Sequence, residues 1–360
     1  MGAGSGAAAD RVTQAFACQA QGRLDEAEAL LRSAVADDPT SLRGHHVLGR
    51  LLMRRGRFAE AEAAFRRVLD LAPGAPSTRL ALAHLLLSQG RYDEGFAYFE
   101  ARFEIAPEKA KPALPFPEWR GEDVAGRKLL IWIEQGYGDQ IQFARFAPRL
   151  KALGAHVTLV CLSPLHRLFA ENLDVRVIAA SGRIDFPDPD FWTMPCSLAG
   201  RLGIGLDQLS GAPYLRAPPG PRRDLPPGLK VGLMTRGNPA HGNDANRSLP
   251  PEQAERLRAA RATVVDLDPA STGAADFADT AALIDQLDLV VSVDTSVAHL
   301  AGAMGKPCWV LLPELDCDWR WLRDRRDSPW YDSARLYRQT PRCDWGEVID
   351  RVLADVAALA

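Results

Sequence analysis

The hydrophobic and polar positions of the chain follow two patterns, and the change lies near residue 110. In the first hundred residues, apolar side chains recur with the spacing of amphipathic helices. Beyond them, short apolar runs such as 128–133, 156–162 and 289–293 alternate with helical stretches. Runs of this length are too short for helices and are typical of buried strands. The pattern therefore predicts a helical region followed by α/β units with parallel sheets.

The helical region repeats every 34 residues. Its matching positions are the small residues Ala27, Ala61 and Gly95, the large residues Leu31, Phe65 and Phe99, and the prolines Pro39, Pro73 and Pro107. This period and order are the tetratricopeptide pattern, in which small residues let paired helices approach and prolines end them. We expect three repeats, at 8–41, 42–75 and 76–109, within a domain at 8–109. Such repeats form a surface suited to a peptide or protein partner; the alternative is that they only cap the domain that follows.

The rest of the chain reads as two α/β lobes joined by proline-rich linkers. We place the first lobe at 122–218, the second lobe at 229–345 and a C-terminal helix at 346–360. In the first lobe, one helix is expected over 140–153, with a bend at Pro148. The first lobe is small for an architecture of two sheet-based lobes around a cleft.

Composition excludes several classes of protein. The net charge of −3 gives no basic field that favours nucleic acid or a membrane surface. The six cysteines are scattered without metal-ligand spacing, which indicates reduced core thiols. No apolar run approaches the roughly 18 residues of a membrane span, and the N-terminus lacks a signal-peptide pattern. We expect a cytoplasmic protein with no nucleic-acid partner and no membrane span.

The stretch 288–313 carries the first candidate site. It reads as strand, turn, helix and strand, and its turn lies at the carboxyl end of a strand, where open α/β sheets bind ligands. Asp294, Thr295 and Ser296 are expected to cap a helix that begins at Val297, and free N–H groups at a helix start suit a phosphate. His299, one turn further on, is close enough to add a donor. The alternative is that these side chains only cap the helix and that His299 is an ordinary buried histidine.

Two loops carry further candidate chemistry. Asp139 follows a strand and begins a helix, so it is either a reactive carboxylate or an N-cap. Arg236–Ser248 is a polar, glycine-rich loop after a strand, where Asn238 and Arg247 are either donors to a phosphate or parts of a solvated loop. Three Asp-x-Asp triplets, at 188–190, 266–268 and 316–318, are expected by chance in a chain with 46 acidic residues, so we predict no metal site. The aromatic and basic run 319–331 is interleaved with aspartates, and we interpret it as a loop near the ligand, not a nucleic-acid site.

These motifs resemble those of the heptosyltransferase-type glycosyltransferases (family 9). The run V-D-T-S-V-A-H at 293–299 resembles the donor-site signature of that family, and E-Q-G-Y-G-D-Q-I-Q-F-A-R at 134–145 resembles bacterial proteins that fuse tetratricopeptide repeats to such an enzyme. Within the loop 236–248 the chain is also similar to these fusion proteins, although Thr235 replaces their usual tryptophan. The resemblance covers about residues 10–350.

The resemblance implies a GT-B fold with two Rossmann-like lobes and an inverting, metal-independent sugar transfer. It implies that Asp139 is the catalytic base, with Glu134, Gln135 and Gly138 on the acceptor side. The residues it implies for the nucleotide-sugar are Asn238, Arg247, Asp294, Thr295, Ser296, Val297 and His299. The nucleotide-sugar is the substrate, and no separate cofactor is expected.

Two functions remain open from the sequence. One is a glycosyltransferase whose repeats recruit a protein, or a protein-bound acceptor. The other is a non-catalytic repeat-based binding protein with a degenerate transferase scaffold. The sequence identifies neither the sugar and its nucleotide nor the acceptor.

Overall fold

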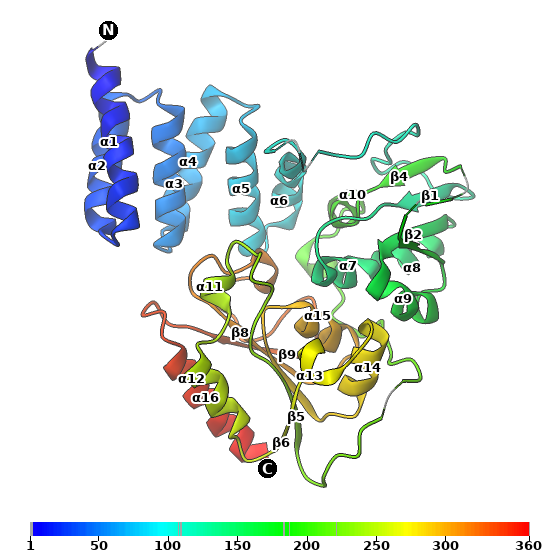
Figure 1. The fold of residues 1–360 in the computed structure, drawn as a ribbon. Helices are drawn as coiled ribbons and strands as arrows, with labels where there is room; N and C mark the ends of the chain where they lie inside the picture. Colours follow the sequence, from blue (N-terminus) through cyan, green and yellow to red (C-terminus); the bar gives the residue numbers. More distant parts are fainter. Residues whose placement is uncertain are drawn as a thin grey trace. The chain divides into compact units, whose positions relative to one another are not determined.

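The computed structural model describes residues 3–106, 108, 110–182, 184–186, 188–220 and 222–359. The chain divides into two compact units, Met1–Ala113 and Leu114–Ala360. The first unit is helical, and the second contains two separate parallel sheets (Figure 1). This order agrees with the predicted change of pattern near residue 110.

The first unit consists of helix pairs that match the 34-residue repeat. Its elements are α1 (Ala3–Ala20), α2 (Leu24–Asp37), α3 (Leu42–Arg54), α4 (Phe58–Leu71), α5 (Pro76–Ser88), α6 (Tyr92–Phe99) and the 3-10 turn η1 (Glu100–Phe103). Between the two helices of each pair, Gly22, Gly56 and Gly90 adopt φ values of 74°, 71° and 77°, which only glycine reaches without strain. Pro39 and Pro73 follow the ends of α2 and α4, as expected; Pro107 lies outside the described residues.

The small residues of the repeat are needed for close helix packing. A Cβ atom at Gly49 would lie 2.5 Å from Cε1 of Phe65, and one at Gly95 would lie 2.6 Å from Cγ of Leu87. Phe65 and Leu87 are both fully buried, so neither has room to move away. The paired helices therefore depend on the absence of a side chain at these positions.

Arginine and glutamate side chains tie each repeat to the next. Glu28 of the first repeat accepts from Arg32 at 2.8 Å and from Arg57 of the second repeat, while Arg32 reaches Glu60 at 2.7 Å. The same network recurs 34 residues later in Arg66–Glu62, Arg91–Glu62 and Arg66–Glu94. In the third repeat the matching positions hold Phe96 and Glu100, so the series ends there, where η1 replaces the second half of the last helix.

The second unit begins with a four-stranded parallel sheet in the order β3-β2-β1-β4. Its strands are β1 (Lys128–Ile131), β2 (His156–Leu162), β3 (Arg176–Ala180) and β4 (Phe191–Thr193), and its helices are α7 (Tyr137–Ala144), α8 (Phe146–Ala152), α9 (His166–Asn172) and α10 (Leu198–Arg201). We call this sheet and its helices the first lobe. The strand β4 was not predicted, because three residues in a turn-rich stretch carry no periodic signal.

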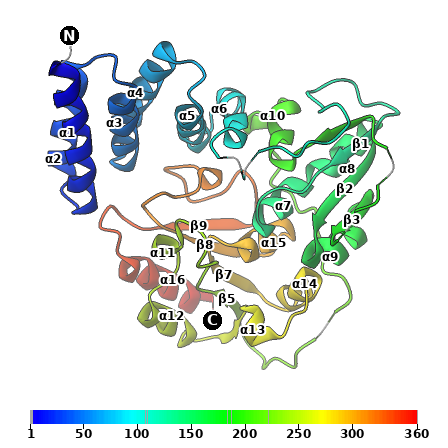
Figure 2. The same ribbon diagram turned by 45° about the horizontal axis from the view of Figure 1, so that its top comes forward.

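The second sheet has five parallel strands in the order β6-β5-β7-β8-β9. Its strands are β5 (Lys230–Met234), β6 (Thr263–Asp266), β7 (Leu289–Val293), β8 (Cys308–Leu312) and β9 (Ala334–Arg338). Its helices are α11 (Asp244–Arg247), α12 (Pro251–Arg258), α13 (Pro269–Thr272), α14 (Phe277–Asp285), α15 (Ser296–Ala303) and α16 (Trp345–Leu359), with the 3-10 turn η6 (Trp319–Trp321) after β8. We call these the second lobe. The helices α12 and α16 cover one face of the sheet, and α14 and α15 lie on the other (Figures 1 and 2).

The two parallel sheets are those of a GT-B architecture with Rossmann-like lobes, as predicted. One detail of the expectation was wrong. The helical segment after β1 breaks at Arg145 and not at Pro148, because the proline ring would clash with the carbonyl of Ala144, four residues earlier. The C-terminal helix α16 spans Trp345–Leu359, and its Val348, Ile349 and Val352 lie in the core of the second lobe.

All six cysteines are free, and Cys18, Cys161, Cys196 and Cys308 are buried, as expected for core thiols. Within the described parts of the chain, no helix has the length and apolar character needed to cross a bilayer.

Candidate active site

The turn between β7 and α15 leaves the start of the helix uncapped. Thr295 occupies the N-cap position in an extended conformation, but its side chain makes no capping hydrogen bond. Its Oγ1 instead lies 3.1 Å from Oγ of Ser292 in the preceding strand. The expectation that side chains cap this helix was therefore wrong for Thr295. The N–H groups of Ala298 and His299 donate to the Thr295 carbonyl, and those of Ser296 and Val297 are left for another acceptor. Val297 is buried, so only its backbone is available to a ligand.

Asp294 precedes that helix as a buried carboxyl group. Burial raises its pKa to about 7, and the negative charge of Asp318 adds to the rise. The Trp321 indole and the cations Arg247 and Arg320 oppose it. The Trp321 Nε1–H is itself buried and makes no hydrogen bond among the described residues. The indole N–H is thus near enough to Asp294 to favour its ionised form, although the two do not meet in hydrogen-bond geometry.

His299 is held as a neutral imidazole. Its Nδ1 lies 2.9 Å from the Tyr331 hydroxyl, and its ring stacks on Trp321 at 5.2 Å between centroids. Burial, with the nearby charge of Arg320, lowers its pKa to about 3. Its Nε2 lies 3.9 Å from the Asp294 carboxylate. His299 is buried, as the alternative held, yet it directs one ring nitrogen toward Asp294.

Arg247 reaches the same turn from α11. Its Nη1 donates to the backbone carbonyl of Asp294 at 2.9 Å, and its Nε donates to Asp244 at 3.1 Å. The guanidinium therefore lies beside the start of α15. A group that binds the same anion as the N–H groups of that helix start has to lie there. Asn238 of this loop is exposed, and its side chain accepts from the N–H of Ala240 at 3.0 Å in a local turn. The structure brings Arg247 to Asp294 but holds Asn238 in no contact with them.

Asp139 lies in the first turn of α7, where its Oδ2 accepts from the N–H of Gly136 at 3.1 Å. Gly136, and not Asp139, is therefore the N-cap residue of α7, and Asp139 has a second partner besides the Gly136 N–H. Its Oδ1 forms an ion pair with Nη2 of Arg320 at 2.5 Å. Burial raises the pKa of Asp139, Arg320 opposes this, and the charges of Asp318 and Glu134 add to it.

The three residues expected on the acceptor side have different surroundings. Glu134 is buried, and its Oε2 accepts from the N–H of Cys196 at 3.2 Å. Gln135 is exposed and adopts a φ of 58°, which is uncommon for a residue with a side chain. Gly138 packs against α15, since a Cβ there would lie 2.7 Å from Cδ2 of His299. Gly138 thus allows the two lobes to pack closely at this point.

Arg320 is the functional candidate that sequence reasoning missed. It lies in η6 of the second lobe, 181 residues from Asp139, and its guanidinium also reaches Gln142 and Asp318. The aromatic and basic run 319–331 was the available signal, but nothing in it separated Arg320 from the neighbouring arginines. In the structure this run lies beside the candidate site, as expected.

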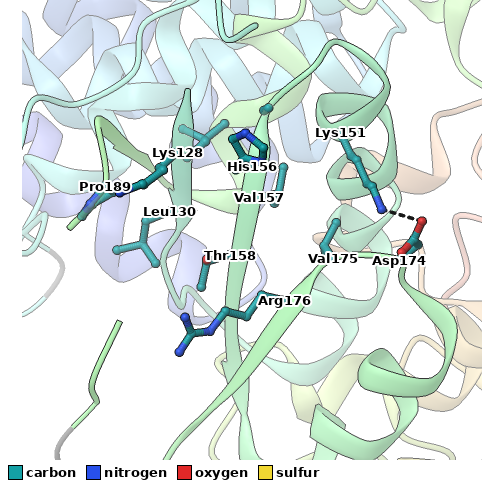
Figure 3. Close-up of a pocket in the computed structure, with 12 residues that line it drawn as sticks. Lys128, Leu130, Lys151, His156, Val157, Thr158, Asp174, Val175, Arg176 and Pro189 are labelled. Atoms are coloured by element: carbon teal, nitrogen blue, oxygen red, sulfur yellow. Dashed lines mark ion pairs between the residues drawn. The ribbon is translucent and has the colours of Figure 1, made fainter. Parts of the chain in front are cut away.

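Among the described residues, no group of three or more His, Cys, Asp or Glu side chains has the arrangement of a metal site. A cavity of about 510 Å³ lies at the amino ends of β1, β2 and β3, at the edge of the sheet opposite the candidate site. Lys128, His156 and Arg176 project from adjacent strands there, and Lys151 pairs with Asp174 at 2.5 Å (Figure 3). None of the predicted site residues lines this cavity.

The fold consists of helical repeats followed by two α/β lobes with parallel sheets. Comparison with known proteins agrees: residues 248–311 match glycosyltransferase family 9 (heptosyltransferase), and residues 13–125 match the middle TPR-like domain of cilia and flagella-associated protein 70. The chain thus carries an N-terminal TPR-like domain and a glycosyltransferase family 9 domain. The predicted glycosyltransferase class is confirmed at the level of this domain.

Protein FlbA of Caulobacter vibrioides is 28% identical over 310 residues, which cover 68% of this chain and 49% of FlbA. The chain therefore spans about half the length of this curated relative. Among solved structures, the first TPR of Spaghetti (RPAP3), bound to an HSP90 peptide, is 18% identical and covers 29% of this chain and 82% of that chain, with a TM-score of 0.28. The chaperone SycD of Yersinia enterocolitica is 19% identical over 28% of this chain and 78% of that chain, with a TM-score of 0.26. At these scores the similarity carries no argument about binding.

Proposed function

We propose that this chain transfers a sugar from a nucleotide-sugar to an acceptor hydroxyl, with inversion and without a metal ion. The observation that carries the proposal is the packing of α7, which carries Asp139, against the start of α15: a Cβ at Gly138 would lie 3.5 Å from Cα of Ser296. Arg247 reaches the same turn through the carbonyl of Asp294. A carboxylate that accepts a proton and a cationic site that accepts a diphosphate are the two groups that such a transfer needs.

In the proposed reaction, Asp139 removes the proton of the acceptor hydroxyl as its oxygen attacks the anomeric carbon of the sugar. The bond from that carbon to the diphosphate breaks, and the nucleoside diphosphate leaves with the electron pair. Arg247 and the N–H groups at Ser296 and Val297 stabilise the negative charge that develops on the leaving phosphate. Asp294 and His299 lie at the same turn and face the sugar.

The repeats supply the proposed acceptor site. The first helices of successive repeats contact one another, α1 with α3 and α3 with α5, so they line the inner side of the stack. Of these helices, α3 carries Arg43, Arg50 and Arg54 on one face and has no acidic residue. No described acidic side chain pairs with Arg50 or Arg54, whereas the second helices of the repeats are rich in acidic residues. An acidic segment of a protein acceptor fits this inner face.

The test of the chemistry is Asp139→Asn with a panel of UDP-, GDP-, ADP- and CMP-sugars. The substitution keeps the shape of the side chain and removes its basicity, so turnover should fall by about 100-fold or more while donor affinity stays within a few-fold. A variant with near-normal turnover would show that Asp139 serves only the helix start. If no donor binds the wild-type chain, the non-catalytic binding protein becomes the better explanation.

Two further parts of the proposal are tested separately. In the proposal, the positive charge of Arg247 stabilises the leaving diphosphate, as a metal ion does in other transferases. EDTA should therefore leave the rate unchanged; loss of activity restored by Mn²⁺ or Mg²⁺ would contradict this.

The proposed compartment is the cytoplasm, because free, buried cysteines are typical of a reducing environment. Fractionation of cells that express the full chain tests that part.

A further inference from the structure

Arg320 connects the second lobe to Asp139 of the first. Its side chain is 7% exposed, so the ion pair of 2.5 Å with Oδ1 of Asp139 is largely shielded from water. An ion pair in such a place acts more strongly on its partner than one at the surface. Because η6 follows β8 and α7 follows β1, this contact exists only while the two lobes lie against each other.

The guanidinium is held in one orientation by two other partners. Its Nε donates to Oε1 of Gln142 at 2.5 Å, and its Nη1 lies 3.0 Å from Oδ2 of Asp318. The bond to Arg320 fixes which way the Gln142 amide points, because the reverse orientation would place two donors against each other. Gln142 is fully buried, and its Nε2 then has no partner among the described residues.

A buried donor without a partner destabilises the folded chain, so its retention needs a reason. The geometry supplies one: with its oxygen committed to Arg320, Gln142 directs that guanidinium toward Asp139. A purely structural link between the lobes would not need this orientation. Arg145 already bridges from the first lobe to the backbone carbonyls of Ser210 and Trp330.

The groups around Asp139 have opposing effects on the pKa of its carboxyl group. Burial and the nearby carboxylates of Asp318 and Glu134 favour its protonated form, and the Gly136 N–H and Arg320 favour its ionised form. Of these two, only Arg320 carries a charge. A base must be ionised before the acceptor arrives, so the charge that keeps it ionised is part of the machinery.

We propose that Arg320 is a positioning residue that keeps the buried Asp139 ionised and holds its carboxylate in place while the lobes lie against each other. This inference rests on the proposed function, in which Asp139 is the base. It assigns to the second lobe a role in proton transfer in addition to donor binding.

The direct test is the titration of Asp139, followed by ¹³C NMR in the full chain labelled at aspartate Cγ. The signal is assigned by its loss in Asp139→Asn. In Arg320→Gln the midpoint should rise by about 1–3 pH units, the usual effect of an adjacent arginine on an aspartate. Arg320→Lys keeps the charge and should leave the midpoint close to that of the wild type. An unchanged midpoint in Arg320→Gln would overturn the proposal.

Arg338→Gln is the matched control. Arg338 holds the same loop through the Trp321 carbonyl at 2.6 Å, and no contact joins it to Asp139. An equal rise in this variant would show that loop packing, and not the charge of Arg320, sets the titration. Circular dichroism establishes that each variant is folded.

A second variant predicts the opposite sign and covers the case in which Arg320→Gln does not fold. Asp318 is partly exposed and caps η6 through the N–H of Arg320, a role that asparagine also performs. Asp318→Asn removes a competing carboxylate, so the midpoint of Asp139 should fall. A rise or no change there would contradict the proposal.

The reaction gives a separate readout. Hydrolysis of a nucleotide-sugar from the same panel uses water as acceptor, so its rate also depends on the ionised form of Asp139. In Arg320→Gln, the acidic limb of the pH–rate profile of hydrolysis should move to higher pH. If Asp139→Asn keeps full hydrolysis, the proposed function fails, whatever the titration shows. If Asp139→Asn is inactive and the limb does not move in Arg320→Gln, only the role of Arg320 fails.

Discussion

Gly138 and His299 pack so closely that a single methyl group would not fit between them. A Cβ at Gly138 would lie 2.7 Å from Cδ2 of His299, and that ring is held by Trp321 on one face and by the Tyr331 hydroxyl at Nδ1. The contact joins α7, which carries Asp139, to α15, whose start faces the proposed diphosphate. Close packing at this point therefore sets the distance between the two halves of the site.

We expect Gly138→Ala to separate α7 from α15 and to lower both stability and turnover. Overpacking of this kind costs about 1–3 kcal/mol, and here the displaced atoms also position the base. Urea denaturation and turnover measure the two effects. Gly136→Ala is the control, because its Cβ would meet only Asp139 Oδ2, at an ordinary 3.5 Å, and its φ of −86° suits any residue. Equal effects of the two substitutions would show that the contact with His299 is not the cause.

The raised pKa of Asp294 predicts a pH dependence of stability. Its ordinary value is 3.8 and its value in the folded chain is about 7, so between these values the folded state binds more protons than the unfolded state. Stability should then decrease as pH rises from about 4 to about 7. Asp294→Asn lacks this titration, so its melting temperature should exceed that of the wild type by an amount that grows over this range.

Melting curves at pH 4.5 and pH 8 measure the difference. If the difference in melting temperature between Asp294→Asn and the wild type is the same at both pH values, Asp294 is ionised in the folded chain. The same conclusion follows if the variant is less stable than the wild type at pH 8. In that case Arg247 and the Trp321 N–H outweigh the cost of its burial.

The structural features that could be predicted from the sequence are those that depend on residues close together in the chain. The repeat is recognisable because Gly22, Gly56 and Gly90 meet the same local need for a left-handed turn, and β7 and α15 follow from one continuous run. The break at Arg145 was placed three residues late because the pattern does not show how far back a proline acts. The strand β4 was missed because pairing with β1, not its own sequence, makes it a strand.

The same limit applies to the site. Asp139, Asp294 and His299 were found through motifs that lie next to strands, but their partners belong to other parts of the chain. The pairs Asp139–Arg320 and Arg247–Asp294 join residues 181 and 47 positions apart. The pKa of Asp294 depends on its burial and on charges from distant parts of the chain such as Asp318 and Arg320, which no local motif shows.

Arg247 should contribute to donor affinity through its charge. Charge-assisted hydrogen bonds are worth about 1.5–3 kcal/mol, so Arg247→Gln should weaken binding of the matching nucleoside diphosphate by about 10- to 100-fold. The effect should be smaller for the nucleoside alone, which lacks the phosphates. Calorimetry with UDP, GDP, ADP and CDP measures it. Arg236→Gln, an exposed arginine of the same loop, is the control; equal losses in both variants would indicate only a general effect of loop charge.

The inner face of the repeats should select an acidic partner. Arg50 and Arg54 lie one turn apart on α3, both are exposed, and His46 beside them bonds Thr78 of α5, which places this face between the first helices. We expect a fluorescent peptide rich in glutamate to bind the full chain more tightly than a lysine-rich peptide of equal length. Its affinity should fall as salt rises, because exposed charges are screened. The double variant Arg50→Glu/Arg54→Glu should lose this binding and, with a protein acceptor, lose transfer while keeping nucleoside diphosphate binding.

Arg67→Glu, on the second helix α4, makes a charge reversal at an exposed site away from the inner face and serves as the control. Fluorescence anisotropy measures peptide binding, and calorimetry measures binding of the nucleoside diphosphate. If both charge-reversal variants weaken peptide binding equally, only the net charge of the chain matters and the inner face is not the site. If the double variant still glycosylates a protein acceptor at the full rate, the repeats do not deliver the acceptor through these arginines.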